Sequence, residues 1–163
     1  MISNGGLFTF DVSLLAQGMR ITEDEVKSYF TDGRRISFVL ERRIAREILE
    51  GKIAKSEGDA WDVVDANGDN WEVRSLTKKL YFCPSYMVGK GRKFDEAGFL
   101  AKLSKIRGYV ISDITLFPDI PVWLVEAREV LEWYQKGELG AGTHTSRAKV
   151  LKLMRGSLGL ENS

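Results

Sequence analysis

Cysteine and histidine are nearly absent from this sequence: its 163 residues include one of each, Cys83 and His144. One cysteine cannot form a disulfide within the chain, and this pair cannot build the usual zinc centre. No apolar run reaches about 18 residues, and the first six residues lack the basic flank and apolar stretch of a signal peptide. We therefore expect a cytoplasmic protein without a membrane partner, in which carboxylates hold any metal.

Proline is also rare, with three residues, and the chain has no internal repeat, low-complexity tract or linker. A length of 163 residues with 44% hydrophobic residues is enough to bury one core. We therefore expect residues 1–163 to form a single domain.

Acidic residues are scarce in one part of the chain and outnumber basic residues in another, which the net charge of +1 does not reveal. Residues 1–72 contain 14 acidic and 9 basic residues, whereas residues 73–107 contain 9 basic and 2 acidic residues. A local basic excess of this kind suits a polyanion such as DNA, and an ordinary solvated surface is the alternative interpretation.

Hydrophobic periodicity predicts helices that alternate with short strands. A capping box at Thr22 and Glu25 begins one helix, and apolar residues every four positions from Ile36 to Ile48 indicate a second. Asn67 and Gly68 lie between two β-rich runs and indicate a hairpin turn. The expected fold is α/β, a small mixed β-sheet flanked by helices. The expected elements are helices over 22–30, 36–49, 94–106, 127–135 and 146–154, a hairpin over 61–76, and strands over 109–117 and 122–125 that are separated by the segment with Pro118 and Pro121.

Three charged residues are expected to meet on the hairpin. Glu72 and Arg74 are two apart on a strand and therefore share one face, while Val73 points to the other. Asp62 can lie beside them across the turn. Carboxylate and carbonyl oxygens are the ligands that Mg²⁺ prefers, so the pattern indicates a magnesium site suited to phosphodiester hydrolysis.

The segment from Asp62 through Glu72-Val73-Arg74-Ser75 resembles the motif of PD-(D/E)XK phosphodiesterases, the superfamily that includes most type II restriction endonucleases. The resemblance is close over residues 62–75 and extends beyond them only to the order of elements. It implies a restriction-endonuclease-like core, a Mg²⁺ cofactor that Mn²⁺ can replace, and metal ligation by Asp62, Glu72 and the Val73 carbonyl. It also implies a further acid upstream, Glu57 or Asp59, and an auxiliary helix acid, Glu41.

Arg74 departs from the family pattern, which has lysine at this position. Arginine keeps its proton in proteins, so Arg74 cannot act as the general base sometimes proposed for that lysine. It can still orient water and bind a phosphate oxygen.

Two segments are predicted to contact DNA. The first follows the hairpin, where glycines let the backbone approach a phosphate and cations supply charge. The second opens the last helix, where free amides suit a phosphate, although its hydroxyls can simply cap that helix. The candidates are Lys78, Lys79, Ser85, Tyr86, Lys90, Arg92 and Lys93 in the first segment, and Thr143, His144, Thr145 and Arg147 in the second.

The leading hypothesis is a metal-dependent endonuclease of double-stranded DNA, of the site-specific restriction type. One active site per chain then calls for a homodimer or a larger recognition subunit. The alternatives are a structure-selective nuclease similar to junction resolvases, a DNA-binding subunit that has lost catalysis, and an unrelated α/β binding domain.

Overall fold

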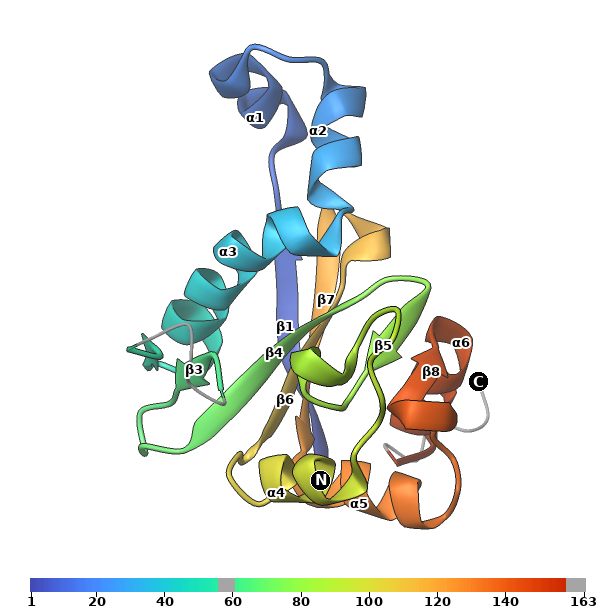
Figure 1. Cartoon of the computed structure of the whole chain (residues 1–163). Coiled ribbons are helices and arrows are strands. Elements are labelled where there is room, and N and C mark those ends of the chain that lie inside the picture. The colour runs from blue at the N-terminus through green and yellow to red at the C-terminus, as the bar shows by residue number, and fades with distance from the viewer. Residues whose placement is uncertain (56–60, 158–163) are drawn as a thin grey trace.

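A mixed six-stranded sheet lies at the centre of the computed structural model, which describes residues 1–55 and 61–157 (Figure 1). The strand order is β1-β7-β6-β4-β3-β2, with β4 and β6 parallel and every other neighbouring pair antiparallel. This confirms the expected α/β class with a mixed sheet. The strands are β1 (Ile2–Thr9), β2 (Lys52–Ile53), β3 (Val63–Val64), β4 (Asn70–Leu76), β6 (Gly108–Asp113) and β7 (Asp119–Glu126), and a separate antiparallel pair is formed by β5 (Lys79–Tyr81) and β8 (His144–Ser146).

Helices and short helical turns connect these strands. No helix in the described part of the chain is both long and apolar enough to cross a membrane. The helices are α1 (Val12–Met19), α2 (Glu23–Phe30), α3 (Gly33–Arg43), α4 (Glu96–Leu103), α5 (Ala127–Gln135) and α6 (Arg147–Ser157), with a π-helical turn η1 (Ile44–Ile48) and 3₁₀ turns η2 (Ser85–Met87), η3 (Ile114–Leu116) and η4 (Ala141–Thr143).

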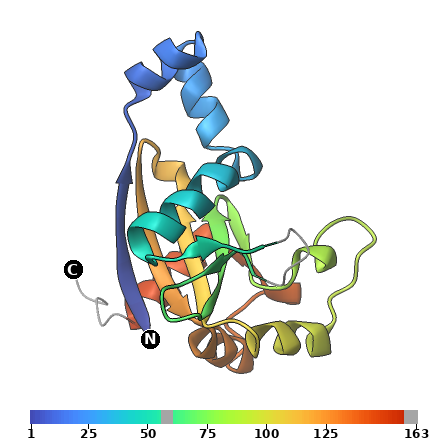
Figure 2. The ribbon, with the colours of Figure 1, turned by 90° about the vertical axis from the view of Figure 1, so that its left-hand side faces the viewer.

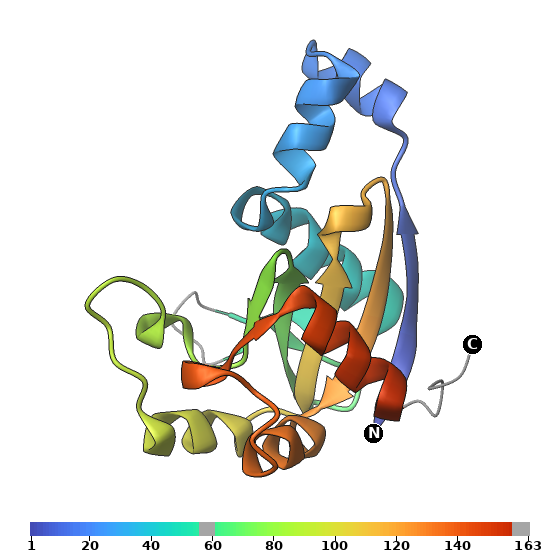
Figure 3. The ribbon, with the colours of Figure 1, turned by 90° about the vertical axis from the view of Figure 1, so that its right-hand side faces the viewer.

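Both faces of the sheet are covered, which explains why all six residues of β6 are buried. Val110 points into the core beneath α2 and α3, while Tyr109 and Ile111 point into a second core beneath β5, α4, α5 and α6. Figures 2 and 3 show α3 over one face and α6 over the other. The helices α1 and α2 rise beyond the end of the sheet (Figure 1).

The elements with the clearest local signals form as expected. Helix α2 begins with the predicted capping box: Glu25 donates its amide to the Thr22 hydroxyl at 3.2 Å, and Thr22 donates its amide to the Glu25 carboxylate at 2.8 Å. Helix α5 has the predicted bounds, and the predicted hairpin forms as β3 and β4. These features depend on contacts between residues close in sequence.

Other elements differ from the prediction. Strand β1 was not predicted, because only Ile2 and Phe8 of its eight residues are buried and no alternating pattern marks it. Pro121 was expected to lie between two strands but lies inside β7. Strand β6 pairs with β7 only from Val122 onward, so the missing amide of Pro121 interrupts no bond to that strand.

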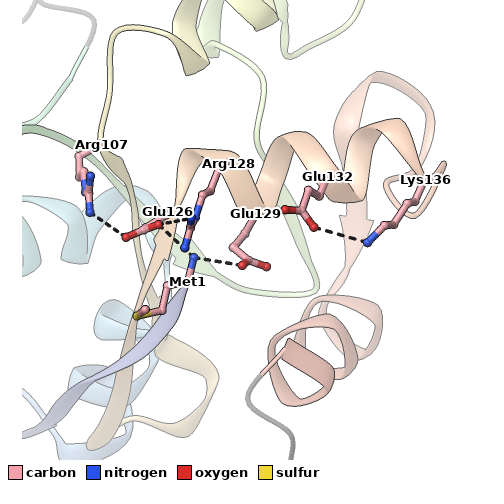
Figure 4. A network of polar contacts seen from close by, with 7 residues as sticks. All are labelled: Met1, Arg107, Glu126, Arg128, Glu129, Glu132 and Lys136. Carbon is pink, nitrogen blue, oxygen red and sulfur yellow. Dashed lines mark hydrogen bonds and ion pairs between the residues drawn. The ribbon is translucent and has the colours of Figure 1, made fainter.

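The sheet end nearest α5 carries a network of exposed ion pairs around Glu126 (Figure 4). Exposed pairs contribute about 0–1 kcal/mol each to stability, so this network adds little to the fold. The contacts of Glu126 are with the Met1 amino group at 3.1 Å, Arg107 at 2.8 Å and Arg128 at 2.7 Å, and Met1 also contacts Glu129 at 3.0 Å.

A different ion pair fastens α6 to the end of β6. The Asp113 carboxylate is fully buried, and the Arg147 guanidinium donates to it from Nη2 at 2.5 Å and from Nε at 3.1 Å. The carboxylate also accepts the Thr115 hydroxyl at 2.6 Å. A buried charge needs such partners, so Arg147 has a structural role.

We predict that Arg147→Ala lowers the free energy of unfolding by about 3 kcal/mol, because it leaves the Asp113 carboxylate buried without its cation. Urea denaturation of the two proteins measures this difference. Lys136→Ala is the matched control, since Lys136 pairs with Glu132 on the surface at 3.5 Å, and it should cost less than about 1 kcal/mol. Equal losses in both variants would contradict the prediction.

Candidate active site

The turn of the β3–β4 hairpin is fixed by its own polar side chains. The Asp65 carboxylate accepts the amides of Asn67 at 2.8 Å and Asp69 at 2.9 Å, and it accepts the Trp71 indole at 2.9 Å. Gly68 has a φ of 88°, which glycine adopts without strain. The predicted turn chemistry is confirmed, and it sets the register of the two strands.

That register brings Asp62 beside Glu72, as the sequence spacing predicted. Asp62 donates its amide to the Trp71 carbonyl at 3.0 Å, and its side chain accepts the Val73 amide at 2.7 Å. This amide lies on the β4 edge just past the short strand β3, so the carboxylate takes the place of a strand partner. Asp62 is thereby held against the β4 backbone at the site.

The Glu72 carboxylate is buried between two cations. Its Oε1 lies 2.5 Å from Arg74 Nη1 and its Oε2 lies 2.7 Å from Lys102 Nζ. Lys102 comes from α4, and the side chains of Glu72 and Lys102 are only 7% and 9% exposed. A carboxylate in this environment requires such pairing to remain charged.

Lys102 was not predicted as a site residue. The sequence gives no local signal for it, because a lysine between Phe99 and Leu103 on an amphipathic helix normally points to solvent. Burial lowers the pKa of its ammonium group, while the neighbouring Glu72 carboxylate opposes that shift.

Glu41 approaches the same place from α3. Burial, followed by the negative charge of Asp62, raises the pKa of Glu41 to about 7. Burial and the charge of Glu72 also raise the pKa of Asp62, against the amide bond from Val73. The structure thus brings the predicted auxiliary acid Glu41 into electrostatic contact with the hairpin carboxylates.

A cleft of about 1090 Å³ opens over these residues. One wall is formed by the α2–α3 connection and α3, the floor is β4, and the other wall is formed by the residues that lead into and include β5. Asp62, Glu41, Val73 and Arg74 line the cleft, whereas Glu72 lies behind them. Both walls also carry cations: Arg34 on the first, and Lys78 and Lys79 on the second.

The donor atoms fit a small divalent cation. Asp62, Glu72 and the Val73 carbonyl offer only oxygen, and Arg74 Nη1 already lies 2.5 Å from Glu72 Oε1 and 3.2 Å from the Val73 carbonyl. A cationic group is therefore accommodated there. Within residues 1–55 and 61–157, no three His, Cys, Asp or Glu side chains converge as a metal site. Mg²⁺ usually takes only one or two protein carboxylates alongside phosphate oxygens.

The predicted upstream acids, Glu57 and Asp59, lie outside the residues that the structure describes. Their place relative to the cleft therefore stays a prediction.

The predicted DNA contacts after the hairpin divide into two groups. Lys78, Lys79 and Ser85 line the cleft. The other group, which does not line the cleft, consists of Tyr86, Lys90, Arg92 and Lys93. These residues belong to η2 and to the loop before α4, and this loop projects from the body of the protein (Figure 3).

The cleft residue Arg34 was not predicted as a DNA contact, because it precedes the basic segment in the sequence.

Three of the four predicted DNA contacts near the last helix are engaged or buried within the protein, and their contact with DNA stays a prediction. Thr143 and Thr145 are buried, and the Thr143 hydroxyl accepts the Cys83 amide at 2.8 Å. Arg147 is engaged with Asp113. His144 remains exposed and packs edge-on against the Tyr81 ring, with 4.0 Å between ring centroids.

We predict that Glu41 destabilises the protein as the pH rises. Its pKa is about 7 in the folded state against about 4.5 in the unfolded state. The folded state therefore binds the proton more tightly than the unfolded state does. The stabilisation that this proton provides is complete below about pH 4.5 and is lost as the pH rises through about 7. Relative to Glu41→Gln, the wild type should lose about 1–2 kcal/mol across this window, allowing for solvent screening. Urea unfolding of both proteins at several pH values measures the difference.

The carboxyl ¹³C resonance of Glu41 provides a direct check. In Asp62→Asn its pKa should fall, because one negative neighbour has been removed. An unchanged titration in that variant would show that Asp62 does not act on Glu41.

Comparisons of this chain with models of protein families, with curated proteins and with solved structures gave no match. The residues of the cleft and their geometry are therefore the basis for proposing a function.

Proposed function

We propose that this protein is a metal-dependent endonuclease that hydrolyses phosphodiester bonds of double-stranded DNA. The observation that carries the proposal is that Asp62 lines a cleft whose walls carry cations, while Glu72 lies buried behind the lining residues and acts electrostatically on Asp62. Carboxylates at the base can hold a divalent ion, and cations above them can hold the phosphate backbone.

Asp62, Glu72 and the Val73 carbonyl would hold Mg²⁺ or Mn²⁺, and the site residues around them fit the remaining tasks. When bound, such an ion polarises the phosphate and makes bound water more acidic. Lys102 holds the second oxygen of Glu72 and so fixes the carboxylate. Glu41, with a pKa of about 7, is suited to accept a proton from the attacking water near neutral pH.

The walls of the cleft are suited to the substrate backbone. Arg34, Lys78 and Lys79 come from separate segments and all line the cleft, so positive charge is available to a bound strand from more than one element. Contacts of this kind position nucleic acid without reading its sequence. Site-specific cleavage of the restriction type would need base contacts from further elements, and cutting both strands would need a second copy or a larger recognition subunit.

A DNA-binding protein without cleavage is the second candidate. Both oxygens of Glu72 already pair with cations, which favours this alternative because a divalent ion must compete for the same carboxylate. The cleavage assay below separates the two candidates.

We predict that purified protein cuts plasmid or linear duplex DNA in the presence of Mg²⁺ or Mn²⁺ and is inactive with a chelator. Glu72→Gln should reduce the rate about a hundredfold or more, since it removes several kcal/mol of transition-state stabilisation. The cleavage rate is followed on gels at saturating protein.

Glu132→Gln is the matched control, since this exposed carboxylate lies on α5 away from the cleft. It should cut at the wild-type rate. Preferential cleavage of a four-way junction would favour a structure-selective nuclease. Tight DNA binding without cleavage by the protein or by a complex with its partner would leave the binding-protein alternative.

The cleft cations generate a separate prediction on binding. Lys78→Ala, Lys79→Ala and Arg34→Ala should each reduce the slope of log affinity against log salt by about 0.9, the value for one lost phosphate contact. Fluorescence anisotropy with a labelled duplex measures it in chelator, so that no cleavage occurs. Lys136→Ala, at the residue that follows α5, is the control and should leave the slope unchanged. The same measurement on Lys90→Ala, Arg92→Ala and Lys93→Ala tests the projecting loop; if only these variants lose slope, the cleft is not the binding surface.

A further inference from the structure

Arg74 makes three contacts that fix its guanidinium group at the base of the cleft. Nη1 lies 2.5 Å from Glu72 Oε1 and donates to the Val73 carbonyl at 3.2 Å, while Nε donates to the Tyr81 carbonyl at 3.2 Å. The last contact joins β4 to β5. The side chain is therefore held by both strands and is not a free arm in the cleft.

Two of these acceptors are also proposed metal ligands. A magnesium ion lies about 2.0–2.1 Å from each oxygen ligand. Because Nη1 is within hydrogen-bond distance of both Glu72 Oε1 and the Val73 carbonyl, the ion and the guanidinium would compete for one space. Their like charges would also repel each other.

Arg74 also stands between Glu72 and the cleft. Val73 and Arg74 line the cleft but Glu72 does not, and the side chain of Glu72 is 7% exposed against 19% for Arg74. An ion entering from the cleft therefore meets the guanidinium before it meets this carboxylate.

We propose that the Arg74 guanidinium is the resident cation of the site and holds it closed. A divalent ion then reaches the Glu72 carboxylate and the Val73 carbonyl only when this side chain moves away. The inference rests on the proposed function and adds its regulation. A phosphate in the cleft offers the displaced guanidinium a bidentate partner, which couples substrate binding to metal entry. By linkage, DNA and the divalent ion then strengthen the binding of each other.

The test is a Mn²⁺ titration of the full chain without DNA, followed by the electron paramagnetic resonance signal of the free ion. Arg74→Gln removes the competing charge and leaves Lys102 on the second oxygen of Glu72. We expect Mn²⁺ to bind about tenfold more tightly, or better, to this variant than to the wild type.

Lys79→Gln is the matched control, because Lys79 lines the same cleft and this substitution removes the same unit of charge. It should change Mn²⁺ affinity by less than about threefold. Equal tightening in Arg74→Gln and Lys79→Gln would overturn the inference, since it would show a general effect of charge. Equal affinity in wild type and Arg74→Gln would overturn closure alone and leave the proposed metal site standing. Absence of Mn²⁺ binding in every protein would remove both.

A measurement on the wild type keeps the inference testable if Arg74→Gln does not fold. The ¹H–¹⁵N resonance of Arg74 Nε reports its hydrogen bond to the Tyr81 carbonyl. We expect this resonance to shift when Mg²⁺ saturates the site and to shift further with a duplex in the cleft. A resonance that stays unchanged at saturating Mg²⁺ would show that the guanidinium does not move, and the inference would be wrong.

Discussion

The buried carboxylate of Glu72 is the constraint on which the site depends. Removing a carboxylate from water is costly unless charged or hydrogen-bonding partners replace the solvent. Arg74 and Lys102 supply these partners at 2.5 and 2.7 Å. Through them one side chain of β4 fixes helix α4 beneath the sheet and, by way of the Arg74 bond to the Tyr81 carbonyl, fixes β5 beside it.

The same charges set the chemistry of the cleft. Burial, followed by the negative charges of Asp62 and Glu72, raises the pKa of Glu41 to about 7. Arg74 and Lys102 offset that charge, so the site balances three carboxylates against two cations. Under the proposed function, a divalent ion would have to compete with this internal pairing, and that competition distinguishes the two candidate functions.

Much of the fold could be predicted because its signals are local. The capping box at Thr22, the Asp65 turn and the apolar spacing of α3 involve residues a few positions apart, so propensity and periodicity determine them. Strand β1 and the pair β5–β8 could not be predicted in this way. Strand β1 is stabilised by pairing with β7, which follows more than a hundred residues later, and Tyr81 pairs with the distant His144.

The candidate site divides in the same way. The sequence by itself determined that Asp62, Glu72 and Arg74 lie together, because side chains alternate along a strand and the turn at Gly68 sets which residues face each other. Only the tertiary structure decided that Lys102 and Glu41 join them and that Thr143, Thr145 and Arg147 have structural roles. The physical reason is that these contacts connect helices to strands distant in the chain, and their burial depends on how all the layers pack.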